Sequence, residues 1–135
     1  MTTNIPSNSL VIDIGKTHIK LHVLNNKFDS IFSKQMKNIV NQNSIYPSMD
    51  TTSIWNWLVE GIKEVTKEYR IKAINITTHG ATAALIDRNS SNSDGLVLPV
   101  LDYEFIGVAD DTPEYDNLRP SYNDTFSPLL PAGLN

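Results

Sequence analysis

The stretch from Asp13 to Thr17 contains the residue types from which a phosphate and metal site can be built. Asp13 stands near the end of the apolar run 10–14, where a carboxylate can hold Mg²⁺, usually through water. Gly15 permits a tight turn and a close approach of the backbone to a ligand. Backbone N–H groups of such a turn can bind phosphate oxygens, and Lys16 or Thr17 can touch a phosphate directly. The plainer alternative is a glycine turn beside an ordinary strand-end aspartate.

Gly15-Lys16-Thr17 also has the form of the end of a Walker A phosphate loop. That loop needs another glycine five residues before Gly15, and this sequence has Leu10 there. The apolar run also leads straight into Gly15, which leaves no loop to wrap the phosphates. We therefore exclude a Walker A loop.

A second polar segment, His79-Gly80, follows residues 71–77, in which apolar and polar residues alternate as in a β-strand. Loops at the ends of strands in α/β sheets tend to bind ligands. An imidazole can donate or accept a hydrogen bond, and a glycine allows a turn beside it. The alternative is a histidine that is satisfied by the local backbone at a glycine turn.

A third polar segment, Asp102-Tyr103-Glu104, follows residues 96–101, which read as a buried extended segment. Carboxylates accept hydrogen bonds from hydroxyl groups, and an aromatic ring offers an apolar surface for a ligand. The alternative is a solvated polar cluster at the end of a strand.

The elements that must position these groups begin with three antiparallel strands. Residues 10–14 form a short apolar run, and residues 18–23 alternate between polar and apolar as a half-buried strand does. Asn25 and Asn26 tolerate positive φ and predict a hairpin turn. Residues 28–34 then predict the third strand.

A helix is predicted after a polar loop over residues 35–50. Residues 50–53 offer N-caps. Apolar residues then recur at helical spacing, and Trp55 is expected to widen their stripe. The residues of this stripe are Ile54, Leu58, Ile62, Val65 and Tyr69. Residues 71–77 return as a strand, so the predicted order is βββαβ.

The rest of the chain has a weaker pattern. Residues 83–87 are apolar and predict a further strand, and residues 88–95 are polar and turn-rich. Beyond Asp102 we find no helical or strand period, and prolines gather there. A compact domain would cover the second face of its sheet with further helices, so this tail suggests an incomplete fold.

The three polar segments together resemble a known family. Asp13-x-Gly15 between two strands resembles the first phosphate loop of the sugar kinase, Hsp70 and actin superfamily. Thr78-His79-Gly80 before Asp87 resembles xylulokinase-like members of the FGGY carbohydrate kinases. The segment 102–104 takes the place of the family's sugar-contacting cluster. It lacks the arginine that commonly follows in glycerol kinases and xylulokinases, which favours a fuculokinase- or rhamnulokinase-like subgroup. The resemblance covers roughly residues 8–105.

This resemblance implies an α/β, RNase H-like fold that is incomplete, with residues 1–135 as a partial N-terminal domain. It implies a carbohydrate kinase that transfers the γ-phosphoryl group of ATP to a sugar hydroxyl with the help of Mg²⁺. Asp13, Gly15, Lys16 and Thr17 would bind the nucleotide phosphates, with Asp13 on the metal. His79, Gly80, Asp102, Tyr103 and Glu104 would bind the sugar.

The family's general base and its second, nucleotide-binding domain are expected beyond residue 135. No catalytic residue is therefore assigned within this chain, and we expect the chain to be inactive by itself. Two other classes of function stay open. One is a non-catalytic sugar-binding or regulatory module, and the other is an inactive remnant or scaffold.

The composition of the chain limits the classes of partner that it can bind. The 135 residues are 40% apolar and 19% charged, with a formal net charge of −4, which gives no support for nucleic-acid binding. Cysteine is absent, which excludes disulfides and thiolate sites. Residues 1–9 lack the basic and apolar parts of a signal peptide, and no apolar run is long enough to span a membrane. We expect a cytoplasmic protein with a small-molecule sugar as partner, and a homo-oligomer is left open.

Overall fold

The computed structural model describes residues 7–107 and 112–128, and the predictions for residues 1–6, 108–111 and 129–135 lie outside this part of the chain. The chain forms two compact units. The first unit consists of Met1–Ile39 and Asp50–Gly80, and the second consists of Val40–Met49 and Ala81–Asn135.

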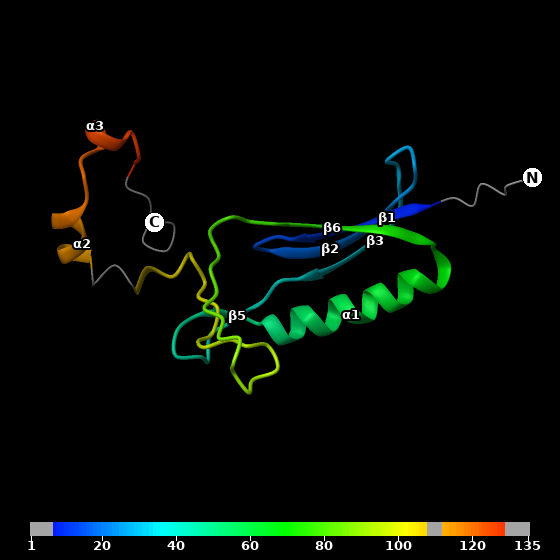
Figure 1. The fold of residues 1–135 in the computed structure, drawn as a ribbon, viewed down its shortest axis with the longest axis horizontal. Coiled ribbons are helices and arrows are strands. Elements are labelled where there is room, and N and C mark those ends of the chain that lie inside the picture. Colours follow the sequence, from blue (N-terminus) through cyan, green and yellow to red (C-terminus); the bar gives the residue numbers. More distant parts are fainter. Residues whose placement is uncertain (1–6, 108–111, 129–135) are drawn as a thin grey trace, which may run out of the picture. The chain divides into compact units, whose positions relative to one another are not determined.

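A four-stranded sheet forms the centre of the first unit (Figure 1). Its strands are β1 (Asn8–Ile14), β2 (His18–Leu24), β3 (Ser30–Lys37) and β6 (Ile71–Thr78), in the order β3-β2-β1-β6. The pairs β1–β2 and β2–β3 are antiparallel, and β6 runs parallel to β1. The three antiparallel strands and the returning strand confirm the predicted arrangement.

The helix α1 (Thr51–Glu68) lies along one face of this sheet (Figure 1). Asp50 is its N-cap, because its carboxylate accepts a hydrogen bond of 3.0 Å from the backbone N–H of Ser53. The predicted apolar stripe is confirmed except at Trp55, which is 66% exposed. Trp57 packs against the core in its place, because residues 54, 57, 58, 61 and 65 share one helical face.

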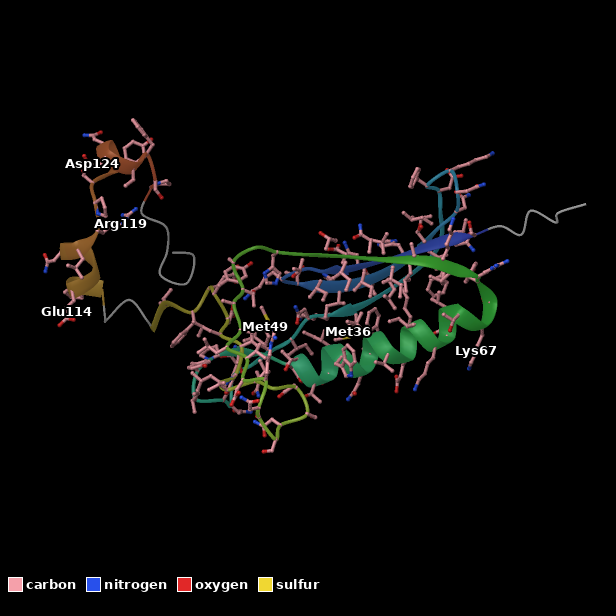
Figure 2. The ribbon with its side chains drawn as sticks, viewed as in Figure 1. Met36, Met49, Lys67, Glu114, Arg119 and Asp124 are labelled. Atoms are coloured by element: carbon pink, nitrogen blue, oxygen red, sulfur yellow. The ribbon has the colours of Figure 1, made fainter. Side chains whose placement is uncertain are left out.

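The core lies between the sheet and α1, and side chains fill this layer (Figure 2). Alternation along β1 and β2 sends every second residue toward the helix. Gly61 lets α1 approach β2 closely, since a Cβ atom there would meet Cδ1 of Leu21. Met36 of β3 also packs against this core. The buried core residues are Leu10, Ile12, Ile19, Leu21, Val23, Leu58 and Val65.

The hairpin turn between β2 and β3 differs from the predicted one. The positive φ of 64° falls on Phe28, and neither Asn25 nor Asn26 has a positive φ. Asn25 contributes its side-chain oxygen, which accepts the N–H groups of Lys27 and Asp29. The loop is therefore longer than predicted, and the third strand starts at Ser30 rather than at Phe28.

The second unit contains short extended pieces. β4 (Val40–Asn41) and β5 (Ser48–Met49) pair as an antiparallel two-stranded sheet, within the range that was predicted as a loop. Leu101 forms a β-bridge with Ser48, and the N–H of Met49 donates to the carbonyl of Val100 at 2.8 Å. The predicted extended segment is therefore confirmed at its carboxyl end.

Two predictions for the second unit were wrong. The strand predicted at residues 83–87 is reduced to one bridge between Ile86 and Leu96. Two helices, α2 (Thr112–Leu118) and α3 (Tyr122–Thr125), occur where no helical period was found. They are too short for an apolar stripe to repeat along them. Within the described residues, no helix combines the length and the apolar character that crossing a membrane requires.

Candidate functional site

Asp13 lies near the carboxyl end of β1 between two polar neighbours. The sheet register places Lys20 of β2 and Thr77 of β6 directly beside it. Nζ of Lys20 lies 3.8 Å from Oδ2 of Asp13, and both side chains are partly exposed. Because Ile12 faces α1, alternation turns Asp13 to the opposite, polar face of the sheet. The predicted metal-binding carboxylate is thus flanked by a cation and a hydroxyl.

The turn after β1 is tight and requires glycine. The N–H of Gly15 donates to the carbonyl of His18 at 3.0 Å, which leaves Lys16 and Thr17 at the tip. A Cβ atom on Gly15 would lie 2.9 Å from the same carbonyl oxygen. Since the N–H of Gly15 is engaged within the turn, the contribution of this residue is conformational: it lets the backbone turn sharply beside Asp13.

Asn38 anchors this turn and was missed in the sequence. Its N–H donates to the carbonyl of Thr17 at 2.9 Å, and its Nδ2 donates to the carbonyl of Gly15 at 2.9 Å. The side chain is buried, with 6% of the residue exposed. An asparagine in a polar stretch gives no sequence signal for such a role, because the contact depends on how β3 ends beside β2.

His79 and Gly80 follow β6 at the same edge of the sheet as the Gly15 turn. Ile14 and Thr78 are register partners, and Oγ1 of Thr78 donates to the carbonyl of Ile14 at 3.1 Å. His79 is half-buried. A Cβ atom on Gly80 would meet no atom within 4 Å, so the space beside it is open. The structure therefore brings the first two predicted segments together.

The third predicted segment belongs to the second unit. Asp102 is 9% exposed, and its Oδ1 accepts the N–H of Glu104 at 3.1 Å. Its carbonyl accepts the N–H of Phe105 at 2.9 Å, so the carboxylate organises a turn directly after the Leu101 bridge. Tyr103 is half-buried and Glu104 is exposed. Two hydrogen bonds therefore hold the backbone of residues 102–105 in a turn.

A cavity of about 110 Å³ in the first unit lies between the end of β3 and the start of α1. Its lining combines apolar and polar residues, and none of the predicted site residues is among them. The lining residues are Met36, Lys37, Asn38, Ile39, Asp50, Ser53 and Ile54.

The donor set around Asp13 fits a loosely held Mg²⁺. Within residues 7–107 and 112–128, no group of three or more His, Cys, Asp or Glu side chains could hold a metal ion. Mg²⁺ in phosphate-transfer sites keeps several waters and is held by one or two carboxylates together with substrate phosphates. The single, partly exposed carboxylate of Asp13 is compatible with that mode, in which the protein does not enclose the ion.

Comparison with known proteins identifies the family of the chain. The family model described as the FGGY family of carbohydrate kinases, N-terminal domain, matches residues 9–96. A carbohydrate kinase from Novosphingobium aromaticivorans is 26% identical, with a TM-score of 0.81 over 97% of this chain and 27% of that chain. No curated protein sequence matches the chain.

More distant solved structures share the fold. Gluconate kinase from Lactobacillus acidophilus is 15% identical, with a TM-score of 0.69 over 84% of this chain and 23% of that chain. Glycerol kinase from Plasmodium falciparum is 18% identical, with a TM-score of 0.63 over 87% of this chain and 24% of that chain. The predicted RNase H-like α/β fold is confirmed, and the chain spans about a quarter of the length of these proteins.

Proposed function

The chain belongs to the FGGY family of carbohydrate kinases, and we propose that its first unit binds the phosphates of ATP and a sugar hydroxyl side by side for phosphoryl transfer. The reaction would move the γ-phosphoryl group of ATP to the sugar hydroxyl. Such a reaction depends chiefly on positioning and on neutralising charge.

One observation carries this proposal. The phosphate-type turn at Gly15 and the segment that begins at Thr78 leave the sheet at adjacent carboxyl ends, held together by the Thr78–Ile14 hydrogen bond. A phosphoryl donor and its acceptor must lie within a few ångströms of each other, and neighbouring strand ends supply that closeness.

On the phosphate side, Lys16 and Thr17 at the tip of the turn would contact phosphate oxygens, with Gly15 allowing the turn. Asp13 would hold Mg²⁺ through water, and that ion would neutralise charge on the phosphates. Lys20 is suited to balance the charge of Asp13, because its ammonium group already lies beside the carboxylate.

On the sugar side, His79 would donate to or accept from a sugar hydroxyl, and Gly80 would let the sugar approach the backbone. We assign Asp102, Tyr103 and Glu104 to sugar binding as well. That assignment rests on the family resemblance and on the ordered turn of the second unit. The absence of an arginine directly after this segment favours a deoxysugar over glycerol as substrate.

A polypeptide of these 135 residues is expected to bind ligands without turning them over. It spans about a quarter of the length of the matching kinases, and no general base is assigned within it. A water-excluding closure of two domains, on which phosphoryl transfer relies, also needs more chain than this.

A thermal-shift screen tests the sugar-binding half of the proposal. The 135-residue chain is heated with a panel of pentoses, hexoses and deoxyketoses, because a ligand that binds only the native state raises its melting temperature. One sugar class is expected to raise it, and His79→Gln is expected to remove the shift. His22→Gln is the matched control, since His22 lies within β2 and away from the strand ends.

Two results would overturn the proposal. A panel in which no sugar stabilises the chain would contradict a sugar site. A shift that survives in His79→Gln but disappears in His22→Gln would place the ligand elsewhere. Release of ADP by the purified chain with MgATP and a sugar would contradict the expected inactivity.

A further inference from the structure

The backbone carbonyls of the Gly15 turn accept hydrogen bonds from Asn38. In a closed two-residue hairpin, the carbonyl of Gly15 would accept from the N–H of His18. Among the backbone hydrogen bonds of the described residues only the reverse bond is present, from the N–H of Gly15 to the carbonyl of His18. The carbonyl of Gly15 accepts from Nδ2 of Asn38.

Asn38 thereby holds the two peptide units that flank the tip, 15–16 and 17–18. Its side chain holds the carbonyl of Gly15, and its own N–H holds the carbonyl of Thr17. The described peptide bonds are trans, so each C=O points away from the N–H of the same peptide unit. With the Gly15 carbonyl directed at Asn38, the N–H of Lys16 is turned to the opposite side of the turn.

The side-chain amide of Asn38 is held in one orientation although this leaves its oxygen without a hydrogen bond. Its Oδ1 is buried and has no hydrogen-bond partner among the described residues. Buried acceptors without a partner are rare and call for an explanation. A flipped amide would place Oδ1 against the carbonyl oxygen of Gly15, two acceptors facing each other, so the contact with the turn dictates the orientation.

From these contacts we propose that Asn38 is a positioning residue for the phosphate turn. Its side-chain amide and its backbone N–H preset the peptide units on the two sides of the tip, so that the turn meets phosphate oxygens without first having to be ordered. This inference rests on the proposed function, since the orientation of the turn matters only if phosphate binds there. Asn38 itself touches neither phosphate nor sugar in this account.

The decisive variant is Asn38→Leu, which has a similar size. It removes the donor to Gly15 together with the unpartnered Oδ1, while the backbone bond to Thr17 remains. The lost bond and the lost orphan acceptor offset each other, and water can replace the donor because Gly15 is partly exposed, so we expect the melting temperature to change little. Asn41→Leu is the control, because Asn41 is exposed and its side-chain oxygen accepts the nearby N–H of Asn43.

The measurement is nuclear magnetic resonance of the ¹⁵N-labelled chain, free and titrated with magnesium tripolyphosphate. In Asn38→Leu the amides of Lys16 and Thr17 are expected to broaden through exchange, while the core amide of Val65 stays sharp. The affinity for tripolyphosphate should fall about fivefold, the size expected for one hydrogen bond. Asn41→Leu should match the wild type in both respects.

Each outcome decides something. Unchanged turn amides and unchanged affinity in Asn38→Leu would overturn the positioning role. Equal broadening of Val65 and Lys16 would reduce Asn38 to a general stabiliser. If wild type binds no tripolyphosphate, the proposed function fails, whereas the anchoring of the turn is still judged by its amide line widths. Should Asn38→Leu not fold, Asn38→Ala removes the same donor without adding bulk or charge, and must give the same two changes.

Discussion

The ammonium group of Lys20 lies 3.8 Å from the carboxylate of Asp13, directly across the β1–β2 pair. Both side chains are partly exposed, so the pair adds little to stability, generally less than about 1 kcal/mol. In the proposed site its importance would be electrostatic: Asp13 would attract Mg²⁺, and Lys20 would attract the phosphate oxygens.

Replacement of Lys20 by glutamine should therefore affect ligand binding more than folding. We expect Lys20→Gln to keep the free energy of unfolding within about 1 kcal/mol of wild type and to weaken magnesium tripolyphosphate binding several-fold, roughly as one charged contact does. Urea unfolding and calorimetric titration measure the two quantities. Lys72→Gln, at an exposed position of β6, is the control. Equal binding by both variants would show that Lys20 has no part in the site.

The two glycines of the site should respond differently to alanine. Gly15→Ala places a Cβ atom 2.9 Å from the carbonyl oxygen of His18, so the turn must shift, at a cost of about 1–3 kcal/mol. Gly80→Ala meets open space and should leave the free energy of unfolding nearly unchanged. Denaturant unfolding of both variants measures this. A Gly80→Ala variant as unstable as Gly15→Ala would contradict the described geometry.

The N-cap of α1 should make the free energy of unfolding depend on pH in the acid range. Hydrogen bonds from the backbone N–H and the hydroxyl of Ser53 hold the pKa of Asp50 below its ordinary value of 3.8. A lowered pKa in the folded chain means that the stabilisation is complete above the unfolded pKa and is lost as pH falls through the folded value. Asp50→Ala should cost about 1 kcal/mol at neutral pH.

Asp50→Asn separates the cap from its charge. Asparagine caps helices about as well as aspartate, so this variant should be nearly as stable as wild type at pH 7. Below pH 3.8 it should lose less stability than wild type, since it has no carboxylate to protonate there. Urea unfolding at pH 7 and at pH values below 3.8 provides the measurement. Identical pH profiles of wild type and Asp50→Asn would rule out this contribution.

The β2–β3 turn offers a stabilising substitution. Phe28 has φ of 64°, a left-handed conformation that is strained for a bulky residue, and it is 80% exposed. Asparagine tolerates this conformation, so Phe28→Asn should raise the free energy of unfolding by about 1 kcal/mol. Ile45→Asn, at a position that is 73% exposed without a positive φ, is the control and should change it by less than about 0.5 kcal/mol. Equal effects would mean that strain at Phe28 is not the cause.

Much of the first unit could be predicted, because buried residues recur at regular intervals along its strands and along its helix. The alternation in β2 follows from one face meeting α1, and the stripe on α1 follows from the reverse contact. Trp55 was placed on the wrong side of this stripe, because hydrophobicity alone does not tell a core tryptophan from an exposed one. Gly61 faces the core where a larger residue would clash, and a glycine carries no hydrophobic signal.

The site was only partly predictable. Asp13, Gly15 and His79 are visible as residue types at strand ends, whereas Lys20 and Thr77 become neighbours of Asp13 only through the sheet register. A two-residue turn at Lys16-Thr17 would have paired residue 13 with residue 20, so that signal was present in the sequence. Asn38 had no such signal, since its role depends on where β3 ends.

The most direct test of the central claim maps both ligands on one sample. The ¹⁵N-labelled chain is titrated with the sugar that stabilises it, and then with magnesium tripolyphosphate. Sugar is predicted to shift the amides of His79 and Gly80 saturably, and tripolyphosphate is predicted to shift those of Lys16 and Thr17. Shifts from both ligands at these neighbouring strand ends would support a phosphoryl-transfer site. A chain in which neither ligand shifts these four amides would contradict the account.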